Sequence, residues 1–192
     1  MSRLPSTPFY MLNETVCSMS ELTSLNAGVT HLTIGSNCMN ENSTVLLHFT
    51  RFAQLKELVV GDSSCVNVDQ LNLIGLSKLR SVVIGENSFT KKKNGFGKEL
   101  NRQFYVKNCP SLRELRIGRY SFSDYGACEI ENVNALEVIV MGELNQVSNT
   151  FYSASLELKS TRQESEIENR LTEVDFAGDW WICVPRQLFG WV

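Results

Sequence analysis

One seven-residue pattern recurs five times in this chain and limits the fold more than any other feature of the sequence. Its copies are VTHLTIG (29–35), LKELVVG (55–61), LRSVVIG (79–85), LRELRIG (112–118) and LEVIVMG (136–142). Successive glycines are 26, 24, 33 and 24 residues apart. Because internal repeats of roughly 20 to 50 residues are typical of stacked structural units, we expect one array of similar units.

The agreement between copies extends beyond these seven residues to apolar positions on either side. They stand eight, six and three residues before the leading Leu, and four residues after the glycine. The positions before the Leu are Leu47, Leu71, Phe104 and Cys128; Phe49, Leu73, Val106 and Ile130; and Phe52, Leu76, Cys109 and Val133. The positions after the glycine are Met39, Cys65, Phe89 and Phe122, whereas the fifth copy has Gln146 there and departs. We predict that the apolar positions form the core.

Each unit is predicted to contain two short strands. The end of the pattern alternates with period two and is rich in Val and Ile, which favours a strand with one buried face. A second alternation, at 71–73, 104–106 and 128–130, predicts another strand. The glycine after the first strand indicates a backbone conformation or a close approach that a side chain would obstruct. One unit of about 24 residues cannot bury its apolar positions alone, so we expect a repeat solenoid with parallel strands.

This spacing resembles the leucine-rich repeat family, which places Leu before and within a short strand. The resemblance rests on Leu55, Leu58 and Val60; Leu79, Val82 and Ile84; Leu112, Leu115 and Ile117; and Leu136, Ile139 and Met141. The ending I-G-x-x-S-F of the third and fourth copies is similar to the BspA-like subtype, although Gly stands near the place of the family's usual Asn. The resemblance implies a solenoid, α/β or mostly β, with terminal caps. It also implies a protein-binding scaffold without catalysis, cofactor or metal.

The repeat divides the chain into three predicted parts. Residues 1–28 are expected to form an N-terminal cap, residues 29–158 the solenoid, and residues 159–192 a C-terminal cap or tail. A sixth copy in register would place Glu164 and Arg170 at the Leu and Gly positions, so the repeat is predicted to stop. The spacing of apolar residues in 163–174 predicts a short amphipathic helix. The Trp-rich end of the chain would cover the core, mediate self-association, or contact a membrane surface.

The predicted strands leave one set of residues facing outward, where a protein partner would bind. Four of them are valines, which is more apolar than a solvated face requires. The candidate partner-binding residues are Thr33, Glu57, Val59, Ser81, Val83, Arg113, Glu114, Arg116, Arg119, Val138 and Val140, with His31 at an outward position beside them. Alternatively, the valines satisfy strand propensity or pack beneath the terminal segment.

A basic segment accompanies the only large insertion, which we place near residues 89–103. Residues 91–119 hold nine Lys and Arg against Glu99 and Glu114, a net +7 in a chain of net −3. We interpret the insertion as a solvated, mobile loop, or alternatively as a loop that binds a partner. Such charge would steer an acidic protein partner. Nucleic acid is disfavoured, because Phe104 and Phe122 occupy core offsets and so provide no exposed stacking surface.

No catalytic or metal-binding motif appears in the sequence. The two histidines, His31 and His48, lie in no metal-ligand spacing, and no phosphate-binding glycine loop or nucleophile elbow is present. We therefore expect a protein that is not an enzyme and uses no cofactor. No stretch has the roughly 20 apolar residues of a membrane-spanning helix.

The cysteines and the N-terminus bear on location. The six cysteines lie at least 18 residues apart without a C-x-x-C pair, which predicts free buried thiols in a reducing compartment. No secretory signal is visible, so a cytoplasmic scaffold or adaptor is expected. The alternative is a fragment of an exported BspA-like surface adhesin, for which the sequons at Asn13 and Asn42 would become relevant.

Overall fold

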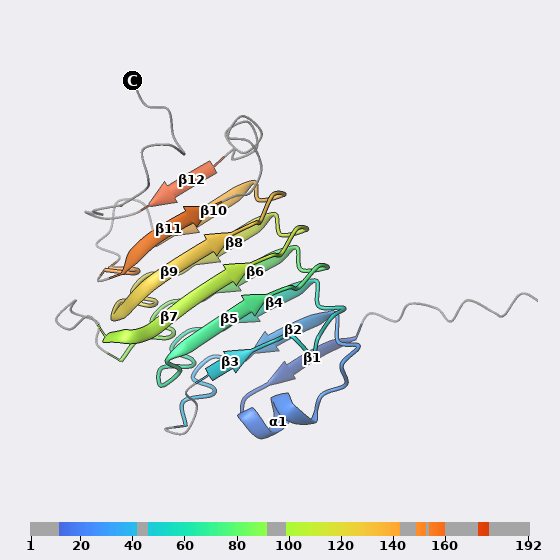
Figure 1. The fold of residues 1–192 in the computed structure, drawn as a ribbon. Coiled ribbons are helices and arrows are strands. Elements are labelled where there is room, and N and C mark those ends of the chain that lie inside the picture. Colours follow the sequence, from blue (N-terminus) through green and yellow to red (C-terminus); the bar gives the residue numbers. More distant parts are fainter. Residues whose placement is uncertain are drawn as a thin grey trace, which may run out of the picture.

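The chain passes alternately through two parallel β-sheets in a computed structural model (Figure 1). The structure describes residues 12–41, 46–91, 99–142, 149–152, 154–159 and 173–176. Strands that follow one another along the chain mostly belong to different sheets, and each pairs with the strand one unit before it and one unit after it. The described residues therefore form mostly parallel strands in two sheets, with one short helix.

The first sheet has seven strands in the order β1-β2-β4-β6-β8-β10-β12. These strands are β1 (Asn13–Val16), β2 (His31–Ile34), β4 (Glu57–Val60), β6 (Ser81–Ile84), β8 (Glu114–Ile117), β10 (Val138–Met141) and β12 (Glu173–Phe176). Equivalent positions of the repeat pair across the sheet, as Leu58 does with Val82 and Val82 with Leu115. The predicted strand at the end of each copy is confirmed.

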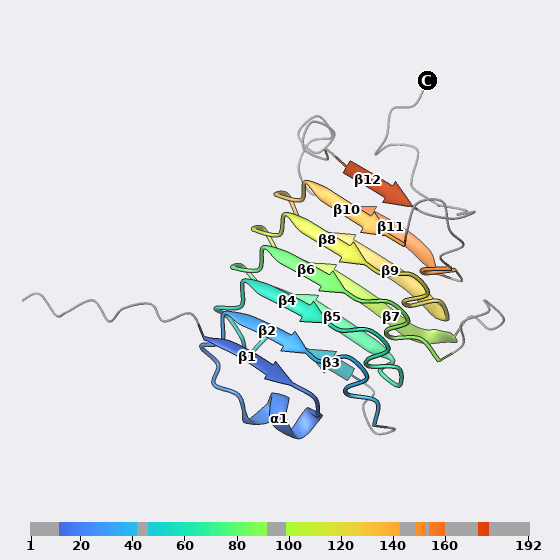
Figure 2. The same cartoon turned by 180° about the vertical axis from the view of Figure 1, so that it is seen from behind.

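The second sheet has five strands in the order β11-β9-β7-β5-β3 and forms a second layer facing the first (Figures 1 and 2). These strands are β3 (Leu46–His48), β5 (Gln70–Ile74), β7 (Glu99–Lys107), β9 (Tyr125–Glu131) and β11 (Ser155–Lys159). They include the second alternation of the sequence, at 71–73, 104–106 and 128–130, so that prediction is also confirmed.

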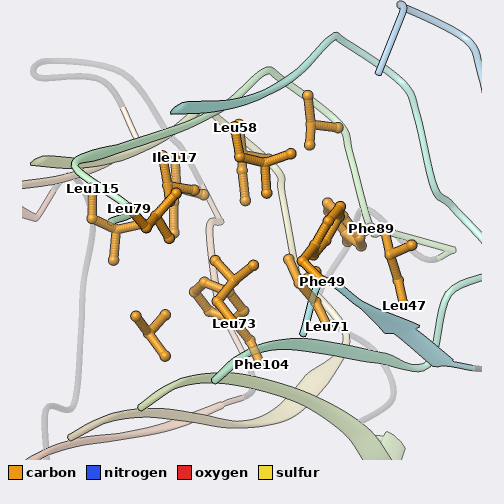
Figure 3. Packing of buried hydrophobic residues seen from close by; sticks show 14 of the residues in the cluster. Leu47, Phe49, Leu58, Leu71, Leu73, Leu79, Phe89, Phe104, Leu115 and Ile117 are labelled. Atoms are coloured by element: carbon orange, nitrogen blue, oxygen red, sulfur yellow. The ribbon is translucent and has the colours of Figure 1, made fainter. Parts of the chain in front are cut away.

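The core lies between the two sheets. Leu58 and Leu115 of the seven-stranded sheet point toward Leu73 and Phe104 of the five-stranded sheet (Figure 3). All the apolar offsets predicted from the repeat are buried. Every unit contributes buried side chains to one continuous apolar layer. Burial of this layer provides the main driving force for folding.

An aromatic stack runs through the core across successive units. The ring of Phe122 lies parallel to those of Phe89 and Phe151, with 4.7 Å between centroids in both pairs. Phe151 thus occupies the core position after the glycine, which the sequence spacing had assigned to Gln146. The expectation that the fifth copy lacks an apolar residue at this position is wrong. The repeat continues there after a longer turn, because Phe151 stands nine residues after Gly142 rather than four.

A buried ladder of hydroxyl groups explains the I-G-x-x-S-F ending. Ser88 donates its hydroxyl to the Gly61 carbonyl (2.8 Å) and accepts from the Ser64 amide (3.2 Å). Ser121 repeats both contacts one unit later, to the Gly85 carbonyl and the Ser88 amide. Each hydroxyl therefore joins one turn to the turn before it, and the buried polar groups of the turns are satisfied.

The glycines of the pattern allow adjacent turns to approach closely. A Cβ added at Gly85 would lie 2.2 Å from Asp62 Oδ1 and 2.8 Å from the Asp62 amide nitrogen. One added at Gly118 would lie 2.7 Å from the Gly85 carbonyl carbon. The prediction that these glycines serve a close approach is confirmed.

The described residues of the predicted N-terminal cap add strand β1 and helix α1 (Met19–Ser24). Strand β1 pairs with β2 in register, and Ser18 caps α1 by accepting from the Glu21 amide. After β3, Arg51 donates to the carbonyl of Thr23 at the end of α1 (2.7 Å) and also to that of Leu25. Helix α1 lies at the end of the stack in both views (Figures 1 and 2).

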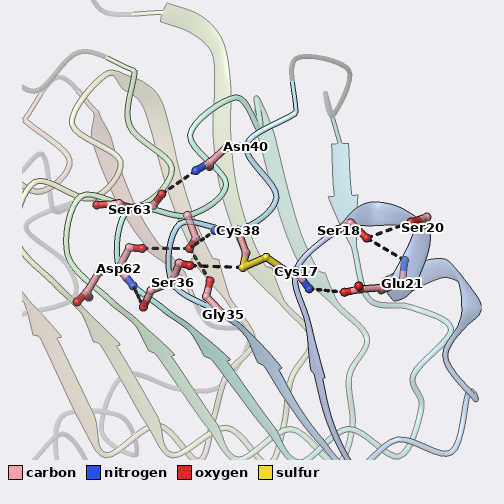
Figure 4. The surroundings of a disulfide bond; sticks show 11 residues. Cys17, Ser18, Ser20, Glu21, Gly35, Ser36, Cys38, Asn40, Asp62 and Ser63 are labelled. Carbon is pink, nitrogen blue, oxygen red and sulfur yellow. Dashed lines mark hydrogen bonds between the residues drawn. A yellow bond between two sulfur atoms is a disulfide. The ribbon is translucent and has the colours of Figure 1, made fainter.

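A disulfide between Cys17 and Cys38 fastens this end of the stack (Figure 4). The expectation of free thiols is therefore wrong for these two residues. Spacing along the chain gave no indication of the pair, because β1 and β2 bring together residues that are 21 positions apart. The remaining cysteines that the structure describes, Cys65, Cys109 and Cys128, are free and buried as expected.

At the other end, the prediction that the repeat stops after residue 158 is wrong. Strand β12 pairs in parallel with β10, and Ile139 is the partner of Val174. Residues 173 and 174 of the predicted amphipathic helix belong to this strand, and residues 163–172 lie outside the described residues. The Trp-rich segment that we expected to cover the core, residues 180–192, also lies outside them.

Candidate protein-binding surface

The outward residues of the seven-stranded sheet form a surface that we call the outer face. Every outward residue predicted on β2, β4, β6, β8 and β10 faces away from the core and is half-buried. Register aligns them in two rows across these strands. One row is His31, Glu57, Ser81, Glu114 and Val138, and the other is Thr33, Val59, Val83, Arg116 and Val140. The structure thus brings together most of the predicted partner-binding residues.

Polar contacts on the outer face are few and concentrate in the first row. Ser81 donates to Glu114 (3.2 Å), and the same carboxylate accepts from Arg116. His31 Nε2 lies 3.9 Å from the Glu57 carboxylate, while its Nδ1 shares a hydrogen bond with the Thr30 hydroxyl (2.9 Å). Between these pairs, the second row presents the adjacent side chains of Val59 and Val83.

The outward side of the five-stranded sheet is different, because its polar groups bind one another. Lys107 pairs with both Glu129 and Glu131 and lies 4.7 Å from the centroid of the Tyr105 ring. Tyr105 in turn donates its hydroxyl to Gln103 (2.6 Å). The hydrogen bond and the ion pairs with Glu129 and Glu131 raise the pKa of Lys107, so this side chain stays charged. The two surfaces therefore differ in their apolar content, since the outer face carries Val59 and Val83 side by side in one row.

The predicted insertion at 89–103 is partly wrong. Phe89 and Thr90 are buried, and residues 99–103 are the first part of strand β7. Only residues 92–98 of this segment lie outside the described residues. Arg102, which the sequence placed in a solvated basic loop, is fully buried with 0% of its surface exposed. Its place two residues before the inward Phe104 was a signal for this orientation, since side chains alternate along a strand.

Arg102 instead forms the centre of an internal polar network. Its guanidinium donates to Asp124 Oδ2 (2.7 Å) and to the carbonyls of Val66 and Val68 (both 2.8 Å). Its Cζ lies 4.7 Å from the centroid of the Tyr125 ring. A buried charge needs such partners, because desolvation would otherwise cost several kcal/mol, on the order of 3–5 for a broken pair. This cation is structural and unavailable to a partner.

The other described cations of residues 91–119 also have acidic neighbours. Lys91 pairs with Asp69 (2.9 Å), Arg113 with Glu137 (3.5 Å) and Arg119 with Glu86 (3.2 Å). All three carboxylates lie more than 20 positions away along the chain, on adjacent units. A count of charge within one sequence window therefore overstates the basic character of this region.

A group of three cations beside the outer face was predicted only in part, since Arg113 was among the candidate residues and Lys56 and Arg80 were not. Lys56, Arg80 and Arg113 immediately precede strands β4, β6 and β8. The backbone ladder continues through them, since the Arg80 amide donates to the Lys56 carbonyl (2.7 Å) and the Arg113 amide to the Arg80 carbonyl (2.9 Å). We call these three residues the basic row. Their shared place, directly after the leading Leu of three successive copies, was visible in the sequence.

The three free cysteines that the structure describes offer no reactive thiol at neutral pH. Burial, together with the nearby charge of Glu41, raises the pKa of Cys65 to about 12. Burial raises the pKa of Cys109 and Cys128 as well. Because the thiolate is the reactive form, these side chains act as small apolar core residues.

Among the residues that the structure describes, no group of three or more His, Cys, Asp or Glu side chains is arranged to hold a metal ion. Nor does any helix there have the length and apolar character needed to cross a membrane.

Comparison with protein-family models, with curated proteins and with solved structures gives no match for this chain.

Proposed function

We propose that this chain is a non-catalytic scaffold or adaptor built as a leucine-rich-repeat-like solenoid, and that it binds a protein partner through the outer face. The observation that carries the proposal is the presence of three half-buried valines, Val59, Val83 and Val140, in one row of the outer face, where Arg116 lies between the second and the third. We call these three valines the apolar row. Apolar residues gathered on one surface are typical of interaction sites, whereas scattered ones are ordinary. On the outward side of the opposite sheet, Lys107 and Lys159 form ion pairs with Glu129, Glu131 and Glu157.

The shape of the outer face also suits a protein partner. Parallel strands place equivalent side chains about 4.8 Å apart along the stack, so a partner meets a regular, nearly continuous surface. Five strands from β2 to β10 contribute two outward residues each. Half-buried positions have little freedom to lose, because their neighbours already restrain them, which lowers the entropic cost of binding.

The experiment replaces the apolar row and follows partner capture. Val59→Ser, Val83→Ser and Val140→Ser are combined in one variant, and a partner recovered by affinity purification is then titrated as a purified protein. We expect weaker binding by about tenfold or more with an unchanged cooperative unfolding transition. A matched control, Ile74→Ser on the outward side of β5, is expected to bind as the wild type. Unchanged affinity in the triple variant would refute the proposal.

A second candidate, an exported surface protein of the BspA-like kind, is supported by the disulfide between Cys17 and Cys38. Structural disulfides persist in oxidising compartments and are rare in the cytosol. Asn13 of the first sequon is exposed on β1, where an oligosaccharide could be attached. The test is mass spectrometry of the protein from its natural source. An oxidised Cys17–Cys38 pair supports export, whereas two free thiols with an unmodified Asn13 would contradict it.

A further inference from the structure

Among the described residues, two of the three cations of the basic row have no carboxylate partner. Among the residues that the structure describes, Lys56 and Arg80 form no ion pair, while Arg113 pairs only at the surface with Glu137. Arg80 and Arg113 are exposed, and 66% of the Arg113 side chain is accessible. A surface pair of this kind contributes only about 0–1 kcal/mol and is readily exchanged for another carboxylate.

The three cations are aligned at the edge of the outer face, next to the row of Glu57, Ser81 and Glu114 and three residues before the row that holds Val59 and Val83. They precede adjacent strands of one sheet, so their Cα atoms follow one another at about the 4.8 Å spacing of paired strands. The whole row spans about 10 Å, which is the length of about three residues of extended peptide. The same strands carry Val59 and Val83 on the outer face.

We propose that the basic row binds an acidic segment of the protein partner, with two or three Asp or Glu side chains in an extended stretch. This inference rests on the proposed function and adds the chemistry of the partner. Carboxylates of the segment would pair with Lys56, Arg80 and Arg113, while neighbouring apolar side chains of the segment would cover Val59 and Val83. Arginine suits this task, because its planar guanidinium matches the two oxygens of a carboxylate.

One feature of the surface favours an acidic peptide over a nucleic acid. Binding of single strands uses exposed aromatic side chains on which bases stack. Among the described residues, Tyr152 is the one strongly exposed aromatic residue, and it lies outside the seven-stranded sheet.

The test uses a fluorescein-labelled peptide with the sequence Gly-Ser-Glu-Val-Glu-Val-Glu-Ser-Gly and measures its fluorescence anisotropy with the whole chain. We expect binding that weakens as salt rises from about 20 to about 150 mM, because exposed charges are screened over about 8 Å at the higher concentration. The variant Lys56→Ala/Arg80→Ala should bind at least about fivefold more weakly. The control Lys107→Ala/Lys159→Ala removes the same charge from the five-stranded sheet and should stay within about twofold.

Three results would overturn the inference. They are no binding of the acidic peptide, an equal loss in both double variants, or tighter binding of a single-stranded oligonucleotide or of anionic lipid vesicles. A peptide with Gln in place of each Glu should bind no better than a scrambled neutral peptide. If the acidic peptide fails while the valine triple variant still loses its partner, the proposed function stands and this inference alone is wrong.

Discussion

Replacing Arg102 by Met tests the residue for which the prediction from the sequence, a solvated loop, differs most from the structure. In a solvated loop this change would be nearly neutral, because Met has a similar length and no partner would be lost. In the structure, the change removes a fully buried charge that binds Asp124 Oδ2 and the carbonyls of Val66 and Val68. The same guanidinium also covers the ring of Tyr125.

The expected loss follows from these contacts. Breaking a buried pair by removing one partner costs about 3–5 kcal/mol, since the other charge is left without compensation. We take about 4 kcal/mol for Arg102→Met, which lowers the equilibrium constant for folding roughly a thousandfold. Removing both charges in Arg102→Met/Asp124→Leu should recover part of this loss, because no buried carboxylate then remains.

The assay is urea unfolding followed by circular dichroism. With an m-value of about 2 kcal/mol per molar urea, the midpoint of Arg102→Met should fall by about 2 M. Lys107→Met is the matched control on the same strand, where a partly exposed ion pair should cost no more than about 1 kcal/mol. If Arg102→Met does not fold, Arg102→Lys takes its place, because lysine keeps the charge and loses the fork of donors. Its urea midpoint should lie below that of Lys107→Met and above the midpoint expected for Arg102→Met. Equal midpoints for Arg102→Met and Lys107→Met would refute the buried network.

Three further predictions concern the turns, the disulfide and the core thiol. Ser88→Ala should lower the free energy of unfolding by about 1–3 kcal/mol in urea titrations, because buried groups of two turns lose their partner, whereas exposed Ser77→Ala should change nothing measurable. Reducing Cys17–Cys38 should cost about 3 kcal/mol, from the loop entropy of a 21-residue separation, and Cys17→Ser should then become insensitive to the reductant. Burial raises the pKa of Cys65 from 9.0 to about 12 in the folded state. The contribution of the protonated thiol to stability is therefore fully present below pH 9 and is lost as the pH rises toward 12. Between pH of about 8 and about 10.5, the free energy of unfolding should therefore fall by about 2 kcal/mol more for the wild type than for Cys65→Val. Equal losses in the two proteins would contradict the raised pKa.

The core and both kinds of strand could be predicted because the repeat keeps the same register in every unit. Parallel strands pair equivalent positions, so an apolar residue at one offset lies next to apolar residues at the same offset of its neighbours. Leu58, Val82 and Leu115 share one offset in the sequence and one rung in the sheet. When the local pattern agrees with the global packing in this way, the strands and the core can be predicted from the sequence.

The ends of the array were harder to read because their copies differ from the pattern. Strand β1 has Glu14 where the next copy has Leu32, so its alternation is hidden. Strand β12 follows Leu171, and its segment ends with Ala177 in place of the glycine. A search that required the glycine therefore missed a copy that lies 35 residues after Gly142.

The candidate surface was predicted in its apolar part and only partly in its charged part, because Lys56 and Arg80 were not among the candidate residues. Alternation along a strand is enough to place Val59 and Val83 outward. Ion pairs, in contrast, join residues of different units, and no count along the sequence shows that Arg119 meets Glu86 while Arg80 lacks such a partner among the described residues. Which cations are available to a partner is therefore a property of the stack rather than of any one segment.

Site-specific photo-crosslinking tests the proposed binding surface most directly. A photoreactive phenylalanine is introduced at Val83 on the outer face, or at Tyr105 on the outward side of the five-stranded sheet, and each protein is irradiated with the captured partner. We expect a covalent complex from position 83 and none from position 105. Crosslinking from position 105 alone, or with equal yield from both positions, would contradict binding through the outer face of the seven-stranded sheet.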